Sequence, residues 1–234
     1  AEGRAVTDNI RRFITYILAS NVPEVLPFVL TALLRIPLAL TVAQILAIDL
    51  GTDVAPALAL GVEAPRPEVM QRPPRRRHPA LIDSALVARA LWLGCTEVAL
   101  CYVGFFVAYR NSGVALSART SGSPLAAIAL ATTVFHAGVV AAQVGSAWAC
   151  RQDRPGWRGI WRGSRLLWAG IGIELALVVA LIYVRPLAAV FNHTRLPLVA
   201  WAGLAVYPFV VWGVDRLRAA VVWRMRHGKE GGER

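Results

Sequence analysis

One short stretch of the sequence places acidic side chains among apolar residues. The string IDLGTDVAP carries Asp49, Thr52 and Asp53 at positions i, i+3 and i+4 of an apolar run. A charged residue at the centre of a membrane helix costs about 2.5–3.5 kcal/mol on insertion scales, so a pair of acids needs compensation. Gly51 and Pro56, both unfavourable inside a helix, lie in the same string. Acids beside helix-breaking residues at membrane depth favour oxygen ligands for a cation where the helix loosens.

A second stretch, SNVPE, lies one apolar segment earlier. Asn21 and Glu24 are at i and i+3, so they project from one helix face. Pro23 has no N–H and cannot donate to the carbonyl of Ala19, which leaves a backbone oxygen free nearby. The two stretches lie at similar distances from the turn between them, which predicts a common depth for Asn21 and Asp49–Asp53. Their carboxylate, amide, hydroxyl and carbonyl oxygens suit a hard cation such as Na⁺, K⁺, Ca²⁺ or H⁺ and argue against copper or zinc.

The acids within apolar spans have no lysine or arginine at comparable depth. These acids are Glu24, Asp49, Asp53, Glu97 and Glu174. Without a neutralising base, the counter-charge must be a proton or a bound cation. The sequence therefore predicts that at least some of these side chains bind a transported ion.

Other polar residues in the spans admit two interpretations. Asn21 and Thr52 could form hydrogen bonds between helices, as polar residues commonly do in membrane bundles. Glu97 could be structural, protonated or functional, whereas Glu174 favours a ligand role because it lies midway along its span. Two further interpretations concern the fourth span: His136 is expected to be a core histidine, and Gln143 and Ser146, which share a face, could be either ligands or packing residues.

The composition is that of a membrane protein. The 234 residues are 56% apolar and 17% charged, with a mean hydropathy of +0.52, whereas a soluble domain carries about 25% charge. Apolar runs of membrane-spanning length recur along the chain, and the very short turn at 35–37 makes the first two an antiparallel hairpin. We expect one all-α domain, residues 1–234, with six spans at about 9–34, 38–61, 80–109, 124–150, 166–184 and 197–222.

The distribution of basic residues predicts the orientation. The N-terminus, the second and fourth loops and the tail hold 19 of the 25 Lys and Arg, against 5 in the other loops. This bias places both termini in the cytoplasm, and Arg89, within the third span, is expected to snorkel to the headgroups. The net charge of +11 lies at span ends, without a basic stripe interleaved with aromatics, so nucleic acid is not an expected partner.

The source and the extent of the protein give two further expectations. An Ala- and Arg-rich chain with one lysine, Lys229, favours a bacterial source and hence a bacterial plasma membrane. The first residue, Ala1, is not followed by a signal peptide pattern, and the missing initiator Met suggests a fragment.

The two acidic stretches also carry a family resemblance. SNVPEVLPF followed by ILAIDLGTDVAPALALGVEAPRPEVMQRPPRR resembles the fifth and sixth transmembrane helices of P-type cation-transporting ATPases, and EGRAVTDNIRRFITY resembles the stalk before them. The motifs IDLGTD and SNVPE are more similar to those of the sodium/potassium and proton/potassium pump branch than to those of calcium pumps. The remaining spans resemble the seventh to tenth helices less specifically, so the resemblance covers essentially the whole chain.

The resemblance implies roles for particular residues. The positions that match cation-coordinating residues of the family are Asn21, Glu24, Asp49, Thr52 and Asp53. The positions that match supporting residues of the sodium pump are Tyr16, Ser20, Gln143 and Glu174. Ser146, also a possible supporting position, stands where the sodium pump has an acid in its eighth helix, which leaves stoichiometry and ion identity open.

The family's catalytic motifs are missing from this sequence. It contains no DKTGT phosphorylation motif, no TGES, no TGDG and no PEG segment of the fourth helix. ATP and Mg²⁺ would therefore bind only in cytoplasmic domains that, with the first four helices, form the N-terminal remainder of the pump. The alternatives are a stand-alone, non-enzymatic bundle of channel-like or regulatory type, and an unrelated secondary transporter that uses the same acids for protons.

Overall fold

The structure is a bundle of helices. The computed structural model describes residues 2–63, 81–111, 124–151 and 165–228, and in these ranges every regular element is helical. Six helical stretches of the described chain are long and apolar enough to cross a membrane, which confirms the expected class. The elements are α1 (Glu2–Ser20), α2 (Val22–Leu34), α3 (Val42–Ala47), the π-helical turn η1 (Ile48–Thr52), α4 (Val54–Gly61), α5 (Ser84–Asn111), α6 (Pro124–Arg151), α8 (Arg165–Tyr183), α9 (Arg185–Val190), α10 (Leu198–Leu204) and α11 (Tyr207–Gly228).

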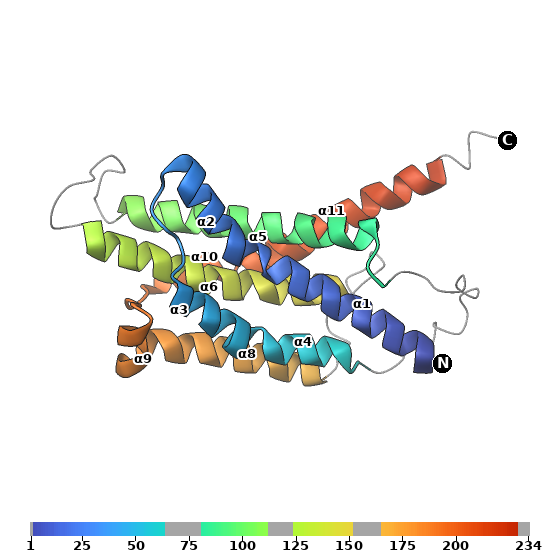
Figure 1. The fold of residues 1–234 in the computed structure, drawn as a ribbon, viewed down its shortest axis with the longest axis horizontal. Helices are drawn as coiled ribbons and strands as arrows, with labels where there is room; N and C mark the ends of the chain where they lie inside the picture. Colours follow the sequence, from blue (N-terminus) through green and yellow to red (C-terminus); the bar gives the residue numbers. More distant parts are fainter. Residues whose placement is uncertain (1, 64–80, 112–123, 152–164, 229–234) are drawn as a thin grey trace.

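Helix α6 forms the centre of the bundle. It is the most buried of the six spans and contacts α1, α4, α5, α8, α10 and α11; Figure 1 shows it between α5 and α8. Its many small residues allow close approach of its neighbours. A Cβ atom added at Gly145, for example, would lie 2.5 Å from the carbonyl oxygen of Pro208 on α11.

The first span is one rod with an interruption at Asn21. Helices α1 and α2 follow each other across this residue and cross the bundle obliquely (Figure 1). The Asn21 side chain donates to the carbonyl of Ile17 at 2.7 Å, and Pro23 follows within the first turn of α2. The interruption therefore lies where the sequence places its polar residues.

The second span differs from the expected one at its start. Arg35 has a left-handed backbone with φ of 55°, and the chain becomes helical only at Val42, four residues later than the expected boundary. Thr41 and Gln44 form a reciprocal capping box, with distances of 3.3 Å and 3.0 Å. The turn between the first two spans is thus longer than the sequence indicates.

A π-helical turn interrupts the second span at the acidic string. The backbone N–H of Asp53 donates to the carbonyl of Ile48, five residues earlier, at 3.0 Å. Such turns occur frequently at functional sites. The loosening expected around Gly51 is confirmed, in the form of one wide turn rather than an unwound segment.

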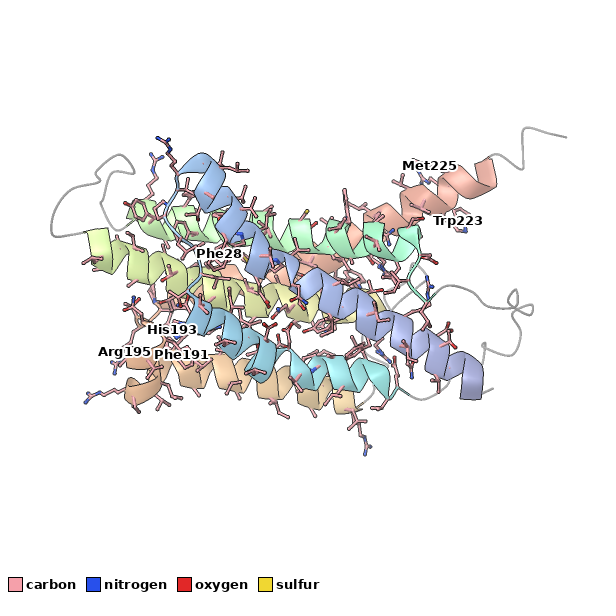
Figure 2. All side chains as sticks on the ribbon, viewed as in Figure 1. Phe28, Phe191, His193, Arg195, Trp223 and Met225 are labelled. Atoms are coloured by element: carbon pink, nitrogen blue, oxygen red, sulfur yellow. The ribbon has the colours of Figure 1, made fainter. Side chains whose placement is uncertain are left out.

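The chain is also interrupted in the sixth span. The helix breaks between α10 and α11, just before Pro208, which cannot donate to the preceding turn. The far part of α11 projects beyond the bundle, and Trp223 and Met225 lie on this projection (Figure 2). Helices α1 and α11 thus have their outer ends at the same end of the molecule (Figure 1), as an even number of spans requires.

Two clusters of ion pairs tie the helices together at that end. Asp215 of α11 is fully buried and pairs with Arg89, Arg216 and Arg218 at 2.8–2.9 Å. Arg89 also donates to the carbonyl of Ala149 at 2.6 Å. The expectation that Arg89 snorkels to the headgroups is therefore wrong, because it has a carboxylate partner that lies 126 residues away in sequence.

The second cluster is centred on Glu63, just after α4. Its carboxylate pairs with Arg12 of α1 at 3.1 Å and with Arg151 at the end of α6. The Asn9 side chain donates to the Glu63 carbonyl at 2.7 Å. All four side chains are buried, so α1, α4 and α6 are joined here by charge. Residues 64–80 and 152–164, which carry a large part of the basic residues behind the orientation bias, lie outside the described ranges, and the orientation stays a prediction.

Candidate cation site

The two acidic stretches meet inside the bundle. Glu24 and Asp53 are 2% and 3% exposed, respectively. The Glu24 carboxyl lies within electrostatic range of Asp53 and Asp49. The interruption of the first span therefore faces the π-helical turn of the second, at the common depth that the hairpin predicts.

The residues of the acidic string do not share one environment. Thr52 is fully buried and donates to the Ile48 carbonyl at 3.2 Å, and Asp53 is buried beside it. Asp49, by contrast, is exposed, as is its neighbour Leu50. The three residues expected on one face thus differ in exposure: Thr52 and Asp53 are buried, whereas Asp49 is exposed.

Two hydroxyl groups of α1 lie beside Asp53. Ser20 and Tyr16 are both buried and both interact with the Asp53 carboxyl. The Ser20 hydroxyl donates to the carbonyl of Ile17 at 3.1 Å, whereas the Tyr16 hydroxyl and Asp53 Oδ1 have no hydrogen bond of normal geometry. Asp53 is thus next to polar groups that leave part of its carboxylate unsatisfied.

A second group of polar side chains lies deeper in the bundle. Glu97 of α5, Ser146 of α6 and Glu174 of α8 are all fully buried, and the Ser146 hydroxyl donates to Glu97 Oε1. Glu174 lies within electrostatic range of both Asp53 and Glu97. Gln143 is one turn from Ser146 on the same face of α6 and is also fully buried.

Close packing at glycines brings these groups together. A Cβ atom at Gly51 would lie 2.7 Å from the Leu177 side chain, and one at Gly170 would lie 3.0 Å from the Ala55 backbone. Glu174 lies between Gly170 and Leu177 on the same helix, so its face of α8 is turned toward η1 and α4. Helix α8 can approach the π turn closely because no side chain intervenes.

A glycine also allows close packing between α1 and α5. A Cβ atom at Gly94 would lie 2.6 Å from the carbonyl oxygen of Ala19. This is the oxygen that Pro23 leaves without its helical donor, and it faces α5 rather than the acidic string. Glu97 is one turn further along the same face of α5.

No base neutralises these acids within the described residues. No ion pair there includes Glu24, Asp49, Asp53, Glu97 or Glu174. Several buried atoms of the site also lack a hydrogen-bond partner: Tyr16 Oη, Glu24 Oε1, Asp53 Oδ1, Glu97 Oε2, both amide atoms of Gln143 and both carboxyl oxygens of Glu174. Buried polar atoms are almost always satisfied, so this concentration points to a ligand.

The site is not a cluster of acids alone. Among the described residues, no group of three or more His, Cys, Asp and Glu side chains is arranged so that it could hold a metal ion. A cation bound here would therefore combine carboxylates with amide, hydroxyl and carbonyl oxygens, which are hard ligands. His136 does not belong to this group of oxygen ligands. Its Nδ1 is 2.7 Å from His193 Nε2, and both rings are buried.

A polytopic helical bundle with unpaired acids at its centre is typical of the membrane part of ion-translocating proteins. Residues 37–221 match the family model described as cation transporting ATPase, C-terminus. The chain therefore belongs to this family of P-type cation-transporting ATPases, and it is their C-terminal transmembrane part.

Relatives from animals share this part of the sequence. The chain is 28% identical over 253 residues to the sodium/potassium-transporting ATPase subunit alpha-2 of Gallus gallus, a match that covers 97% of this chain and 25% of the relative. It is 39% identical over 114 residues to subunit alpha-3 of Homo sapiens and 40% identical over 114 residues to the alpha subunit of Drosophila melanogaster, each match covering 48% of this chain and 11% of the relative. The chain spans about a quarter of the length of the first of these relatives and less of the others.

Proposed function

We propose that this chain supplies the intramembrane cation-binding site of an ATP-driven pump. The observation that carries the proposal is the set of buried acids, Glu24, Asp53, Glu97 and Glu174, for which the described residues provide no ion-pair partner. Asn21, Glu24, Asp49, Thr52 and Asp53 would bind the cation, and Tyr16 and Ser20 would hold Asp53. The hard oxygen ligands select the class Na⁺, K⁺, H⁺ or Ca²⁺.

The exposure of Asp49 indicates that further helices cover this surface in the intact protein. Asp49 lies at mid-span on a surface whose neighbour, Leu50, is 76% exposed. A carboxylate facing hydrocarbon is costly, so another protein element must cover this surface. The first four helices of the pump, which this chain does not contain, would supply that cover. This argument favours a pump over a stand-alone bundle.

The mechanism follows from the way the acids are held. In the intact pump, phosphorylation of an aspartate in the cytoplasmic domains would alternate access to the site from the two membrane faces, and Mg²⁺ and ATP would bind there. In this chain, α1 continues from the site toward those domains, and its start is fixed to α4 and α6 through Glu63. A displacement of α1 would change the distance between Glu24 and Asp53 and hence the affinity for cation.

Cation-stimulated ATP hydrolysis by the full-length protein tests the proposal. We expect Asp53→Asn to abolish the stimulation by the transported cation, because it removes a carboxylate from the centre of the site. Asp83→Asn is the matched control, since Asp83 lies outside the spans and its side chain is 44% exposed. Wild-type stimulation and cation affinity in Asp53→Asn would contradict the site assignment.

A further inference from the structure

Two buried histidines face each other at the end of the bundle opposite to the start of α1. His136 belongs to α6 and is fully buried, and His193 lies between α9 and α10 with 8% of its surface exposed. Nδ1 of His136 is 2.7 Å from Nε2 of His193, and the ring centroids are 4.8 Å apart. Figure 2 shows His193 beside α9, far from the projecting end of α11. Within the described residues, no hydrogen bond joins either ring to the oxygen ligands of the proposed cation site.

The end of α9 fixes the position of His193. Asn192 has a left-handed backbone with φ of 54°. The backbone N–H of His193 donates to the carbonyl of Ala188 at 2.8 Å, and that of Asn192 donates to the carbonyl three residues earlier at 3.4 Å. These are the two bonds of a Schellman motif, with Asn in the place of the usual Gly. The next residue, Thr194, donates its N–H to the hydroxyl of Thr133 on α6 at 3.0 Å, so the segment 191–194 (the His193 segment) lies against α6.

The hydrogen bonds determine which nitrogen atoms carry protons in the neutral pair. His193 Nδ1 is 3.2 Å from the carbonyl oxygen of Leu181. A carbonyl only accepts, so His193 Nδ1 is protonated and His193 Nε2 has the lone pair. Nδ1 of His136 then donates to this lone pair, and Nε2 of His136 is buried with a lone pair of its own and no partner. The neutral pair is thus a chain of two hydrogen bonds that ends on α8.

An added proton disrupts this arrangement wherever it binds. On Nε2 of His193 it places two N–H groups against each other across the 2.7 Å contact. If His136 responds by moving its own proton to Nε2, a buried N–H remains without an acceptor. A proton that binds directly to Nε2 of His136 creates a fully buried cation. Each form leaves a positive charge in a desolvated position, which is costly without a carboxylate.

The described surroundings contain no carboxylate in contact with either ring. Neither histidine takes part in an ion pair of the described chain. The charged and titratable side chains that come closest along the surrounding elements are Arg185 and Arg195 of the same connection, Tyr183 and Glu174 of α8, Tyr102 of α5 and Asp49 after α3. Glu174 is seven residues from Leu181 along α8, which corresponds to about 10 Å. The two arginines are exposed and add positive charge.

One buried side chain joins the His193 segment to the helix that leads into the π turn. Gln44 of α3 is fully buried, and its Nε2 donates to the carbonyl of Phe191 at 3.1 Å. Its Oε1 accepts from the N–H of Thr41 in the capping box at 3.0 Å. The backbone carbonyl of Gln44 accepts from the N–H of Ile48, the first residue of η1. A displacement of the His193 segment therefore acts on the start of the second span, one turn before the acidic string.

We propose that His136 and His193 form a pH-sensitive switch: the neutral pair holds the His193 segment against α6 and α3, and protonation releases the segment and lowers the affinity of the cation site. This proposal rests on the proposed function, because it concerns the regulation of the same site. Burial lowers the pKa of His193 below its ordinary value. The closed state is therefore favoured above a pH of about 6.5 and loses stability as the pH falls below that value.

Exchange of the rings for amides removes the titration and retains polar groups. His193→Gln replaces the less buried ring with a side chain that takes up no proton. His136→Asn combined with His193→Gln places an amide at each of the two facing nitrogen positions, so that the contact can form without titrating. His78→Gln is the matched control, because it is the same exchange in the sequence between the second and third spans.

Two measurements on the purified full-length protein, at a pH of about 7.5 and about 5.5, test the switch. The first is hydrogen exchange without added cation, corrected for the intrinsic exchange rate, and the second is equilibrium binding of radioactive sodium, rubidium or calcium. In wild type and His78→Gln we expect lower protection of residues 191–197 and a higher dissociation constant at the lower pH. The dissociation constant should rise about three to ten times more than in His193→Gln and the double variant, since one pH unit below a pKa of about 6.5 charges about ten rings for each neutral one.

The other outcomes decide against the switch. The same pH dependence of binding in wild type and in the folded variants overturns it, and so does a loss of protection in wild type without a larger loss of affinity. If His193→Gln does not fold, the double variant decides alone. If Asp53→Asn abolishes binding while the histidine variants keep the wild-type pH dependence, only the switch fails. If wild type binds none of the three cations at a pH of about 7.5, the proposed function fails, and its regulation fails with it.

Discussion

Buried acids occur in two regions of this molecule, and the two regions differ in what surrounds the acids. At the end of the bundle where α1 begins, Asp215 has three arginine partners and Glu63 has two. At mid-span, Glu24, Asp53 and Glu174 have no ion-pair partner among the described residues, and some of their oxygens lack any hydrogen bond. The same side-chain chemistry thus occurs in two settings: the arginine-paired acids join helices to one another, and we propose that the unpaired ones bind an ion.

The comparison implies opposite effects on stability. Removing one partner from a buried ion pair leaves an uncompensated charge and destabilises strongly. Removing an acid that has no partner relieves a desolvation cost instead. Mutation of the two classes should therefore separate structure from function.

The largest effect is expected at Asp215. Asp215→Asn leaves Arg89, Arg216 and Arg218 without their shared carboxylate, and we expect the full-length protein to lose about 3–5 kcal/mol of stability. The measurement is the thermal unfolding midpoint in detergent, with Glu174→Gln as the contrasting variant, for which we expect an unchanged or higher midpoint. Equal destabilisation by both variants would remove the distinction between the two regions.

A smaller effect is expected at Glu63. Glu63→Gln keeps the hydrogen-bonding shape but removes the charge between Arg12 and Arg151, so we expect a loss of about 1–3 kcal/mol. Protection from hydrogen exchange at the start of α1 should fall more than protection of α8, because the cluster joins α1 to α4 and α6. Asp83→Asn, which alters a partly exposed pair with Arg11, should cost no more than about 1 kcal/mol. An equal loss of hydrogen-exchange protection in α1 and α8 would contradict the claim that the Glu63 cluster stabilises α1 locally.

The smallest effect is expected at the opposite end, where His193 lies near α9 (Figure 2). Burial lowers the pKa of His193 below its ordinary value, although its hydrogen bond to the Leu181 carbonyl acts in the other direction. A histidine with a lowered pKa in the folded state stabilises the fold above the unfolded pKa of about 6.5, and this stability is lost as the pH falls below that value.

We therefore expect proteolysis of the segment 184–197 to accelerate when the pH is lowered from about 7.5 to about 5.5. His193→Gln should flatten this pH dependence and cost about 1 kcal/mol, since it breaks the contact with His136. A pH profile in the variant that matches wild type would show that another group is responsible.

Local sequence patterns predicted most of the fold and the main features of the site. The lengths of the apolar runs predicted six spans, and Gly51 predicted that the second span loosens. The hairpin of the first two spans predicted a common depth for Asn21 and Asp49–Asp53, and the structure brings Glu24 of the first span beside Asp53 of the second. Each of these features depends on residues close together in sequence.

Features that depend on distant residues could not be predicted in this way. The partner of Arg89 is Asp215, and the partner of Ser146 is Glu97; neither pair has a signature in sequence spacing. The exposure of Asp49 beside the buried Thr52 and Asp53 could not be predicted either, and hydrophobic periodicity does not distinguish the π turn from an α-helix. In the sequence Glu97 could be recognised only as an acid inside an apolar span, and this does not give its position relative to Ser146 on α6.

The central claim is that the unpaired acids at mid-span are held for a bound cation. The most direct test is the thermal midpoint of the full-length protein as a function of Na⁺, K⁺ or Ca²⁺ concentration, since a ligand that binds the folded state stabilises it by about 4 kcal/mol at a thousand times its Kd. We predict a rising midpoint with at least one of these cations in wild type and in Asp83→Asn, and none in Asp53→Asn. A folded Asp53→Asn variant that keeps the full cation-dependent rise would contradict the account.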